Sequence, residues 1–433
     1  MTLLPVPGTG SGASATTGPL VARTVPIPLS LAHDLLAVMP SAPADQLMSW
    51  VRRGEGFVGW GKVASIRTAG PDRFTEAEAW WQSLVQSAQI HSELAVPGTG
   101  PIALGSFSYS ADSAAGASLT VPQVVIGRRG DLAWVTTMGV GSAPEVPQLD
   151  ASLPEQPIGI RFADGARSSP EWATVVSAAV ARIIDGDLDK VVLARDLEVQ
   201  ADSPIDARWL LARLAERYDN TWVFSVDGLV GATPELLVRL DKGLVHSRVL
   251  AGTIRRTGDD EHDLALAGSL ARSSKDLEEH EYAVRSVADA LRPHCYSMNV
   301  PEAPFVLHLT NVMHLATDVA GVLGDRTTSL TLAASLHPSA AVCGTPTGKA
   351  DAVIAEIEGM DRGRYAGPVG WMDANGDGEW GIALRCGVVE DDARMRLFAG
   401  CGIVAGSDPE AELAESDAKF IPMRDALTAP PLA

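Results

Sequence analysis

Cysteine is scarce in this chain, and its four cysteines lie far apart. No two of them form a CxxC pair, so the spacing argues against a zinc ribbon, a redox motif and a disulfide framework. Long apolar runs are also missing, because none reaches the roughly 18 residues of a membrane-spanning helix. We therefore expect a protein with no membrane partner and with buried or half-buried thiols at Cys295, Cys343, Cys386 and Cys401.

Basic residues are outnumbered in this chain, with 34 lysines and arginines against 54 acidic residues and a net charge of −20. A surface this acidic repels phosphate backbones and anionic lipid head groups, so no nucleic acid partner is expected. The N-terminal region has no basic segment ahead of an apolar stretch, so we expect no secretory signal and a cytoplasmic protein. An anionic substrate would need a local cationic pocket or a bound metal.

The 433 residues suffice for two ordinary domains or for one large α/β body. Residues 1–25 are rich in Gly, Ser, Thr and Pro, which predicts a flexible N-terminal tail. Residues 26–157 alternate short apolar segments with Gly/Pro turns around one helical stretch near Glu76–Ile90 and end in a Pro-rich connector. We expect this sheet-rich part to belong to the same fold as a catalytic region at 158–430.

Regular patterns become clearer after the connector. Ser169 followed by Pro170 and Glu171 predicts a helix start, and a strand is expected at Lys190–Val199. Gly-containing turns then separate segments that predict an antiparallel meander. We expect one helix over Glu261–Leu291 and a last helix announced by a capping box at Ser407-x-x-Glu410. The expected meander strands are Thr221–Val226, Leu229–Leu240 and Leu244–Ile254.

Two strings imitate well-known binding loops. Gly344-x-x-x-Gly348-Lys-Ala has one residue too few between its glycines for a phosphate loop, and Ala stands where Ser or Thr should hold magnesium. Asp373-x-Asn375-x-Asp377-Gly begins like a calcium loop, but Leu occupies the twelfth position, where a bidentate Glu is required. A hairpin turn explains the second string better.

Acidic residues recur at helical spacing in two places. Asp276 and Glu279 are three residues apart on one expected helix, and Glu412, Glu415 and Lys419 have spacings of three and four on another. Such sets are usually solvated helix flanks. The alternative is that the two helices bring their carboxylates together around one Mg²⁺, which prefers oxygen ligands.

Lys190 and Glu235 each accompany an apolar strand segment. Taken singly, each is an ordinary strand charge. Taken as a pair, they could supply a general base and a general acid.

Eight segments, in their order and spacing over residues 190–420, resemble the chorismate-utilising enzyme family, which includes isochorismate, anthranilate, aminodeoxychorismate and salicylate synthases. The resemblance implies an α+β fold in which large antiparallel sheets pack together with helices on the outside, as a single intertwined catalytic body. The matching segments are KVVLAR at Lys190, TPELLVR at Thr233, LAGTIRR at Leu250, SSKDLEEHEYAV at Ser273, HPSAAVCGTP at His337, RYAGPVGW at Arg364, LRC at Leu384 and AGCGIVAGSDPEAELAESDAK at Ala399.

The resemblance also implies roles for the polar residues. Lys190 matches the base that activates water, and Glu235 matches the acid that protonates the departing C4 hydroxyl. Asp276 is a small departure, because Glu is common at that position in the family. The carboxylates that match the Mg²⁺ site are Glu279 and Glu415 as direct ligands and Asp276 and Glu412 as outer residues acting through water.

The two substrate carboxylates are matched by separate groups. Those that match the ring carboxylate site are Gly252, Thr253 and Lys419, with His314 beside them. Those that match the enolpyruvyl carboxylate site are Tyr365, Arg385 and the backbone at Gly402. A dianionic substrate would then meet Mg²⁺ at one end and a planar guanidinium at the other, which answers the problem posed by the acidic chain.

Two alanines bear on the choice of family member. Ala251 stands where aminodeoxychorismate synthases carry a nucleophilic Lys, and Ala341 stands where anthranilate and salicylate enzymes typically carry Thr. The resemblance therefore implies Mg²⁺-dependent isomerisation of chorismate to isochorismate, with water as the nucleophile and no glutaminase subunit. The product would feed menaquinone, siderophore or salicylate synthesis. A salicylate synthase and a catalytically silent chorismate-binding homologue are the alternatives.

Overall fold

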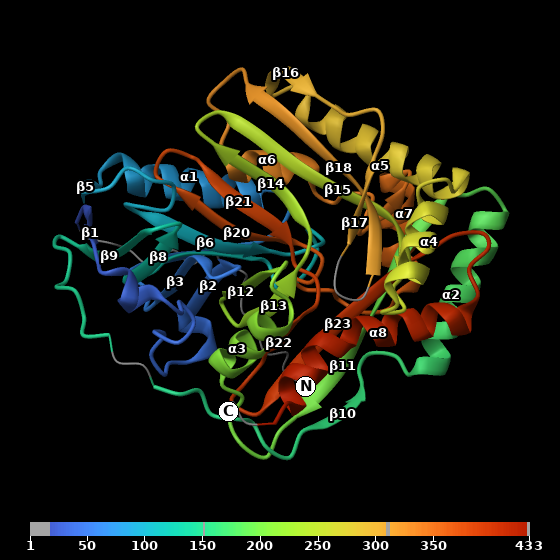
Figure 1. The fold of residues 1–433 in the computed structure, drawn as a ribbon, viewed down its shortest axis with the longest axis horizontal. Coiled ribbons are helices and arrows are strands. Elements are labelled where there is room, and N and C mark those ends of the chain that lie inside the picture. Colours follow the sequence, from blue (N-terminus) through green and yellow to red (C-terminus); the bar gives the residue numbers. More distant parts are fainter. Residues whose placement is uncertain (1–17, 150–151, 309–311, 431–433) are drawn as a thin grey trace, which may run out of the picture.

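The computed structural model describes residues 18–149, 152–308 and 312–430 (Figure 1). Helices lie on the outside of two packed sheets, and strands from distant parts of the chain lie side by side. The helices are α1 (Arg73–Gln86), α2 (Ser169–Ile184), α3 (Ala207–Arg217), α4 (Asp260–Leu270), α5 (Ser274–Leu291), α6 (Ser329–Leu336), α7 (Thr347–Ile357) and α8 (Pro409–Thr428), with short 3₁₀ helices η1 (Leu29–Ala32) and η2 (Ala44–Gln46).

The larger sheet has 13 strands, and its neighbours are antiparallel except for β1 and β5. In spatial order it contains β10 (Arg161–Asp164), β11 (Lys190–Gln200), β23 (Arg394–Ile403), β22 (Cys386–Val389), β13 (Leu229–Thr233), β12 (Trp222–Val226), β2 (Leu47–Arg52), β3 (Glu55–Trp60), β8 (Val124–Arg129), β9 (Leu132–Val140), β1 (Leu20–Pro26) and β5 (Gln89–Ser92), and β19 (Gly344–Thr345) pairs with β11.

The smaller sheet has ten strands, all paired antiparallel. Its order is β16 (Cys295–Asn299), β18 (Val312–Leu323), β15 (Leu244–Arg255), β14 (Leu236–Asp241), β21 (Gly378–Ile382), β20 (Pro368–Asp373), β6 (Ile102–Phe107), β7 (Ala117–Val121) and β4 (Ala64–Thr68), and β17 (Phe305–His308) pairs with β18.

Large aromatic side chains pack the two sheets against each other. The Phe57 ring meets the Trp371 ring edge-on at 4.9 Å, and the Trp50 indole donates a 2.8 Å hydrogen bond to Glu379 across the same interface. Both sheets also contain strands from the first 140 residues and from the second half of the chain. The predicted α+β fold with one intertwined body is therefore confirmed.

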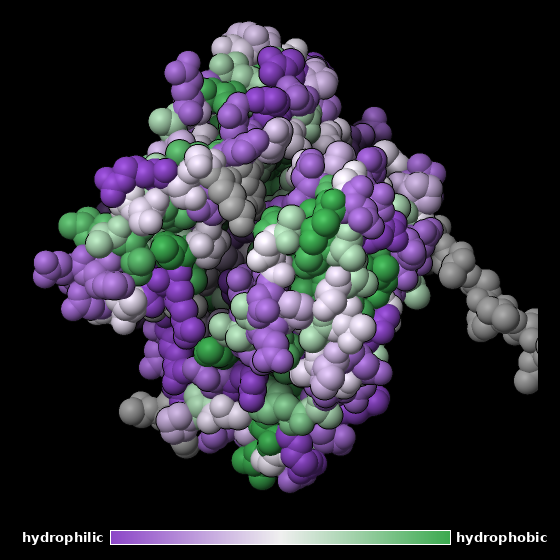
Figure 2. Space-filling view, turned by 90° about the vertical axis from the view of Figure 1, so that its right-hand side faces the viewer, coloured by the Kyte–Doolittle hydropathy of each residue, from purple (hydrophilic) through white to green (hydrophobic). Residues whose placement is uncertain are grey.

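Hydrophilic residues cover most of the face on which α2, α4 and α8 lie (Figure 2). Smaller hydrophobic patches interrupt this cover, and the surface is hollowed near the middle of the face. Within the described residues, no helix is both long and apolar enough to cross a membrane.

Three predicted boundaries were wrong. Residues 20–25, expected in the flexible tail, belong to β1, because their backbone pairs antiparallel with β9 inside the larger sheet. The helix expected over Glu261–Leu291 is two helices, since the Ser273 hydroxyl accepts the Asp276 N–H and starts α5 afresh. The last helix is capped by Asp408, whose carboxylate accepts the Ala411 N–H, and not by Ser407.

The strand expected over Leu229–Leu240 is also divided, and this division places a site residue. Pro234 has no N–H to donate to a sheet, so β13 ends at Thr233 in the larger sheet and β14 begins at Leu236 in the smaller one. Glu235 therefore lies where the chain passes between the sheets. Its carbonyl accepts the Ile382 N–H at 3.1 Å, which holds the crossing against the end of β21.

Candidate active site

Lys190 opens β11, as predicted, and its side chain lies across the neighbouring strand β23. A Cβ added at Gly402 would lie 2.8 Å from Lys190 Cε and 3.4 Å from its Nζ. Gly402 pairs with Val192 in the sheet, so only a residue without a side chain leaves room for the lysine there. The missing Cβ at 402 thus leaves room for the Lys190 amine over β23.

Glu235 is half-buried at the crossing between the sheets. Burial raises the pKa of its carboxyl to about 7, because the charged form loses hydration. Three nearby cations act in the opposite direction, and these are Arg385, Lys190 and Lys419. A carboxylic acid that keeps its proton near neutral pH beside cations is suited to general acid catalysis.

Arg385 stands immediately before β22 with a backbone φ of 49°, a left-handed conformation that side chains rarely adopt. Its carbonyl accepts the Ala232 N–H at 3.2 Å, which holds this turn against β13. Burial lowers the pKa of Arg385, and the nearby Tyr365 and Glu415 raise it, so the guanidinium stays charged. Tyr365 is buried and stacks on Phe398 at 5.4 Å.

Lys419 reaches from α8 to β23. Its ammonium donates a 2.8 Å hydrogen bond to the Gly400 carbonyl and forms a 2.7 Å ion pair with Glu415. Gly400 lies two residues before Gly402, so Lys419 approaches the strand against which Lys190 lies. The predicted carboxylate-binding lysine and the predicted base therefore belong to one cationic region.

Thr253 and His314 meet on the smaller sheet. They pair across β15 and β18, next to a register shift at Gly252, and Thr253 Oγ1 lies 2.9 Å from His314 Nδ1. Burial and the charges of Arg385 and Lys419 lower the pKa of His314 to about 4, so the imidazole is neutral at pH 7. The same two cations act on Glu235, which brings this pair near the acid.

The acidic residues approach from two helices. A Cβ at Gly252 would lie 3.2 Å from the Asp276 Cβ, so α5 presents Asp276 to the strand that carries Thr253. On α8, Glu415 pairs with Lys419, and Glu412 accepts a 2.6 Å hydrogen bond from Ser407. Glu415 also acts electrostatically on His314, so the two helices lie on either side of the same site.

No group of three or more His, Cys, Asp or Glu side chains in the described part of the chain is close enough to hold a metal ion. Glu279 lies within α5, but its side chain is outside the described residues. The set of four carboxylates predicted for Mg²⁺ therefore stays a prediction.

Ala341 lies in the loop between α6 and β19. Because β19 pairs Thr345 with Lys190, and Cys343 accepts the Val192 N–H at 2.8 Å, the loop is bound to the start of β11. Ala341 precedes Cys343 by two residues, so the alanine that bears on the family member belongs to the loop bound to β11.

A buried ion pair that the sequence analysis missed holds this arrangement. Arg362 and Glu358 meet at 2.6 Å with side chains only 3% and 1% exposed. Arg362 also donates to the Val342 carbonyl at 2.9 Å and to the Val192 carbonyl at 2.7 Å, and Glu358 accepts the Ala194 N–H at 2.8 Å. The pair thus ties the Ala341 loop to β11. The only sign of this pair in the sequence is that Glu358 and Arg362 are four residues apart, the spacing of neighbours on one helix face.

His280, also missed, connects α5 to the strands of the binding site. Its Nδ1 lies 3.2 Å from the Ala251 carbonyl and its Nε2 2.7 Å from Thr317 Oγ1. A carbonyl only accepts, so Nδ1 carries a proton and donates to it. The imidazole holds the metal-binding candidates of α5 in register with Gly252. His280 directly follows Glu279, and the sequence there has no distinct pattern that marks the histidine as a site residue.

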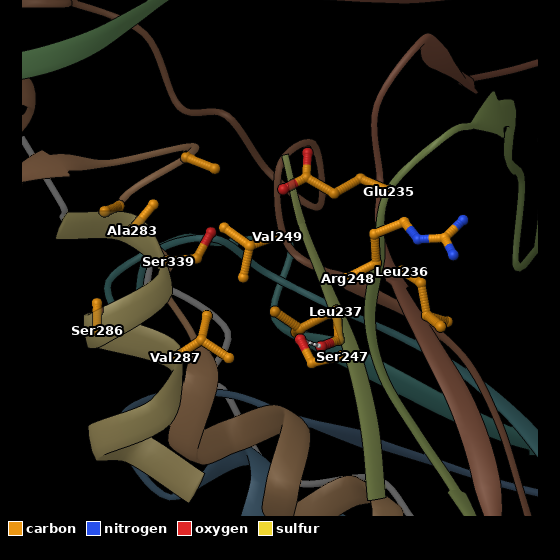
Figure 3. Close-up of a pocket in the computed structure, with 12 residues that line it drawn as sticks. Glu235, Leu236, Leu237, Ser247, Arg248, Val249, Ala283, Ser286, Val287 and Ser339 are labelled. Atoms are coloured by element: carbon orange, nitrogen blue, oxygen red, sulfur yellow. Dashed lines mark hydrogen bonds between the residues drawn. The ribbon is translucent and has the colours of Figure 1, made fainter. Parts of the chain in front are cut away.

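A cavity of about 340 Å³, its opening to solvent included, lies between α5 and the strands β14 and β15. Figure 3 shows Glu235 at its upper rim, with Ser339 and Val249 facing the space and Ala283 on α5 beside it. Ala341 also lines this cavity. The structure thus brings together Lys190, Glu235, Thr253, His314, Arg385 and Lys419, with the predicted acid at the edge of an open space.

A family model described as chorismate binding enzyme matches residues 13–428. Isochorismate synthase DhbC of Bacillus subtilis is 41% identical over 293 residues, which cover 65% of this chain and 73% of that protein. Isochorismate synthase MenF of the same organism is 33% identical over 404 residues, covering 86% of this chain and 85% of that protein.

Among solved structures, MenF of Escherichia coli, described as a menaquinone-specific isochorismate synthase, superposes with a TM-score of 0.81. The superposition covers 95% of this chain and 96% of that chain at 24% sequence identity. At this identity the likeness supports the fold.

Proposed function

Because this chain belongs to the chorismate binding enzyme family, we propose that it converts chorismate into isochorismate. The observation that carries the proposal is the placement of Glu235, a carboxyl with a pKa raised to about 7, among the cations Lys190, Arg385 and Lys419. An acid that is still protonated near neutral pH, next to a lysine, matches a reaction in which one hydroxyl leaves the ring and another is added.

In the proposed reaction Lys190, as the amine, takes a proton from the water that adds at C2. Glu235 donates its proton to the hydroxyl at C4, the C4–O bond breaks, and water leaves as the ring double bonds shift. Positioned acids and bases of this kind each contribute roughly 10²–10⁴ in rate. The position of Lys190 over Gly402 supports the role of base, since the glycine leaves space there for the amine.

Two groups of residues would hold the substrate dianion. Arg385, with Tyr365 and the Gly402 backbone, would bind the enolpyruvyl carboxylate, because a planar guanidinium matches a carboxylate. Thr253, Lys419 and neutral His314 would bind the ring carboxylate. Burial of these cations strengthens their attraction to a dianion and supports binding by an otherwise acidic protein.

Magnesium would be held by the carboxylates of α5 and α8. Hard oxygen ligands are the ones that Mg²⁺ prefers, and Asp276 and Glu415 approach the Thr253–His314 pair from two sides. The bound ion would supply positive charge to the ring carboxylate. Glu279 and Glu415 would be the direct ligands, with Asp276 and Glu412 in the outer positions.

The proposed product keeps its enolpyruvyl group. Ala341 lines the cavity beside Glu235 and offers a methyl group and no hydroxyl, which favours water addition and release over elimination of pyruvate. Ala251 likewise supplies no nucleophile.

Product analysis tests this proposal directly. We expect the purified protein, incubated with chorismate and Mg²⁺, to yield isochorismate by chromatography. A chelator should stop turnover and added Mg²⁺ should restore it. Salicylate and pyruvate released in step with chorismate loss, above the spontaneous breakdown of isochorismate in matched buffer, would replace the proposal with a salicylate synthase. No product at all would indicate a catalytically silent homologue.

A further inference from the structure

The cavity beside Glu235 continues past the residues assigned to the substrate. Its lining includes Glu235 at one side and Ser286 of α5 at another, and Ser286 is exposed to solvent. In Figure 3 these two residues are drawn on opposite sides of the space, with Ser339 between them. The cavity therefore has both Glu235 and the solvent-exposed Ser286 of α5 in its lining.

Ser339 is the unexplained polar group in this cavity. Its Oγ is fully buried and has no hydrogen-bond partner among the described residues. The Ser339 carbonyl accepts the N–H groups of Val342 and Cys343 at 3.1 and 3.0 Å, so the turn that carries the hydroxyl is fixed. Buried hydroxyls in native proteins nearly always have a partner, and a water bound in the cavity, whose mainly apolar lining also includes Glu235 and Ser286, would supply one.

The proposed reaction creates a need for such water. After each turnover Glu235 has given its proton to the departing C4 hydroxyl and is ionised, while Lys190 has gained a proton from the added water. Glu235 must take up a proton from solvent before it can act again, and Lys190 must lose one. A half-buried carboxylate does this through water that reaches it.

We propose that Ser339 is a positioning residue, which binds a water in this cavity and so gives solvent protons a path to Glu235. The hydroxyl holds the water between the open side at Ser286 and the carboxylate. This inference rests on the proposed function, because only an acid that is used in every turnover needs reprotonation.

The experiment compares Ser339→Thr with Ser339→Val. The two side chains have nearly the same shape, and both add a methyl group to the serine, but only threonine keeps a hydroxyl. We expect Ser339→Thr to stay within about twofold of the wild-type kcat and Ser339→Val to lose about tenfold, as for one lost hydrogen bond, with KM changed little. Thermal unfolding should be alike in the two variants.

Equal kcat values for the Thr and Val variants would overturn the inference, whether both are active or both are impaired, because the hydroxyl would then not matter. A rise in KM that accounts for the whole loss would also overturn it and assign Ser339 to substrate binding. Glu235→Gln separates this failure from that of the proposed function. If Glu235→Gln turns over like the wild type, the proposed acid is wrong; if it is inactive while the Thr and Val variants match, only the role of Ser339 is wrong.

Discussion

The residues of the site form two walls. The larger-sheet wall comes from three neighbouring strands of the larger sheet, or the turn before one of them, and contains Lys190, Gly402 and Arg385. The smaller-sheet wall comes from the smaller sheet and the helix that covers it, and contains Thr253 and Asp276. In the larger-sheet wall, the buried ion pair of Arg362 and Glu358 binds β11 to the loop that carries Ala341. The smaller-sheet wall has weaker contacts, such as the hydrogen bond between Thr253 and His314, and Thr253 is exposed.

This difference follows the demands of the proposed chemistry. Proton transfer requires a geometry fixed to a fraction of an ångström, which a strand pairing such as β11 with β23 and a buried guanidinium provide. Carboxylate binding tolerates more movement, because charge attraction falls off slowly with distance. Changes at Lys190 and Gly402 should therefore reduce kcat, and changes at Thr253 should mainly raise KM.

Removing the reacting groups should have the largest effect. Lys190→Gln and Glu235→Gln should each lower kcat by roughly 10²–10⁴, because each loses a proton transfer that the other residue cannot perform. Isochorismate formation measures the loss. Lys349→Gln, at an exposed lysine on α7, is the control and should keep wild-type activity. A folded Lys190→Gln enzyme with near-native turnover would remove the base from this account.

Breaking the buried ion pair of Arg362 and Glu358 should have the next largest effect, and this effect is on stability. Arg362→Met leaves Glu358 buried without its partner and the Val192 and Val342 carbonyls without a donor, so the free energy of unfolding should fall by about 3–5 kcal/mol. Denaturant unfolding measures this. Replacing Glu358 by Leu as well should recover part of the loss. A single variant as stable as the wild type would show that the pair does not hold the wall.

Gly402→Ala should displace the Lys190 amine. The added Cβ comes within 2.8 Å of Lys190 Cε, so the side chain must move, and kcat should fall by roughly 10–100-fold with little change in thermal stability. Gly406→Ala is the matched control, because nothing lies within 4 Å of a Cβ there. Equal activity of the two variants would show that the path of Lys190 is not critical.

Thr253→Val should have the smallest effect, on the other wall. The variant loses the hydroxyl that meets His314, so KM should rise by roughly 3–10-fold while kcat stays within about twofold. Steady-state kinetics separate the two constants, and Thr253→Ser should restore KM. A fall in kcat with unchanged KM would erase the contrast between the walls.

The sequence predicted the α+β fold class, the strand that begins at Lys190 and the hairpin at Asp373, whose carboxylate accepts the Asn375 and Asp377 N–H groups. The strand and the hairpin depend on neighbours in the chain, through side-chain alternation and turn residues, whereas the fold class was implied by the family resemblance. The split at Pro234 was also available in the sequence, because proline cannot donate to a central strand. It was missed because the apolar pattern continues on both sides.

Contacts between distant segments could not be predicted in this way. Nothing in the local pattern at Arg362 shows that it reaches two carbonyls of other segments, or that Gly402 is open because Lys190 lies over it. Likewise, nothing in the sequence around Ser339 indicates that its hydroxyl is buried. These properties arise from packing, which depends on which elements the fold brings together.

The protonation state of Glu235 tests the central claim most directly. The proposed chemistry requires a protonated acid beside a lysine near neutral pH, and the pKa of Glu235 is raised to about 7 by burial and lowered in part by Lys190. The carboxyl should then be neutral below about pH 7 and ionised above it.

Infrared difference spectra can follow the protonated carboxyl band through a pH titration, with Glu235→Gln identifying the band. The account predicts a midpoint near pH 7 in the wild type and a higher midpoint in Lys190→Gln, where the stabilising cation is gone. A midpoint near the ordinary glutamate value of about 4.3, or one that Lys190→Gln leaves unchanged, would contradict it.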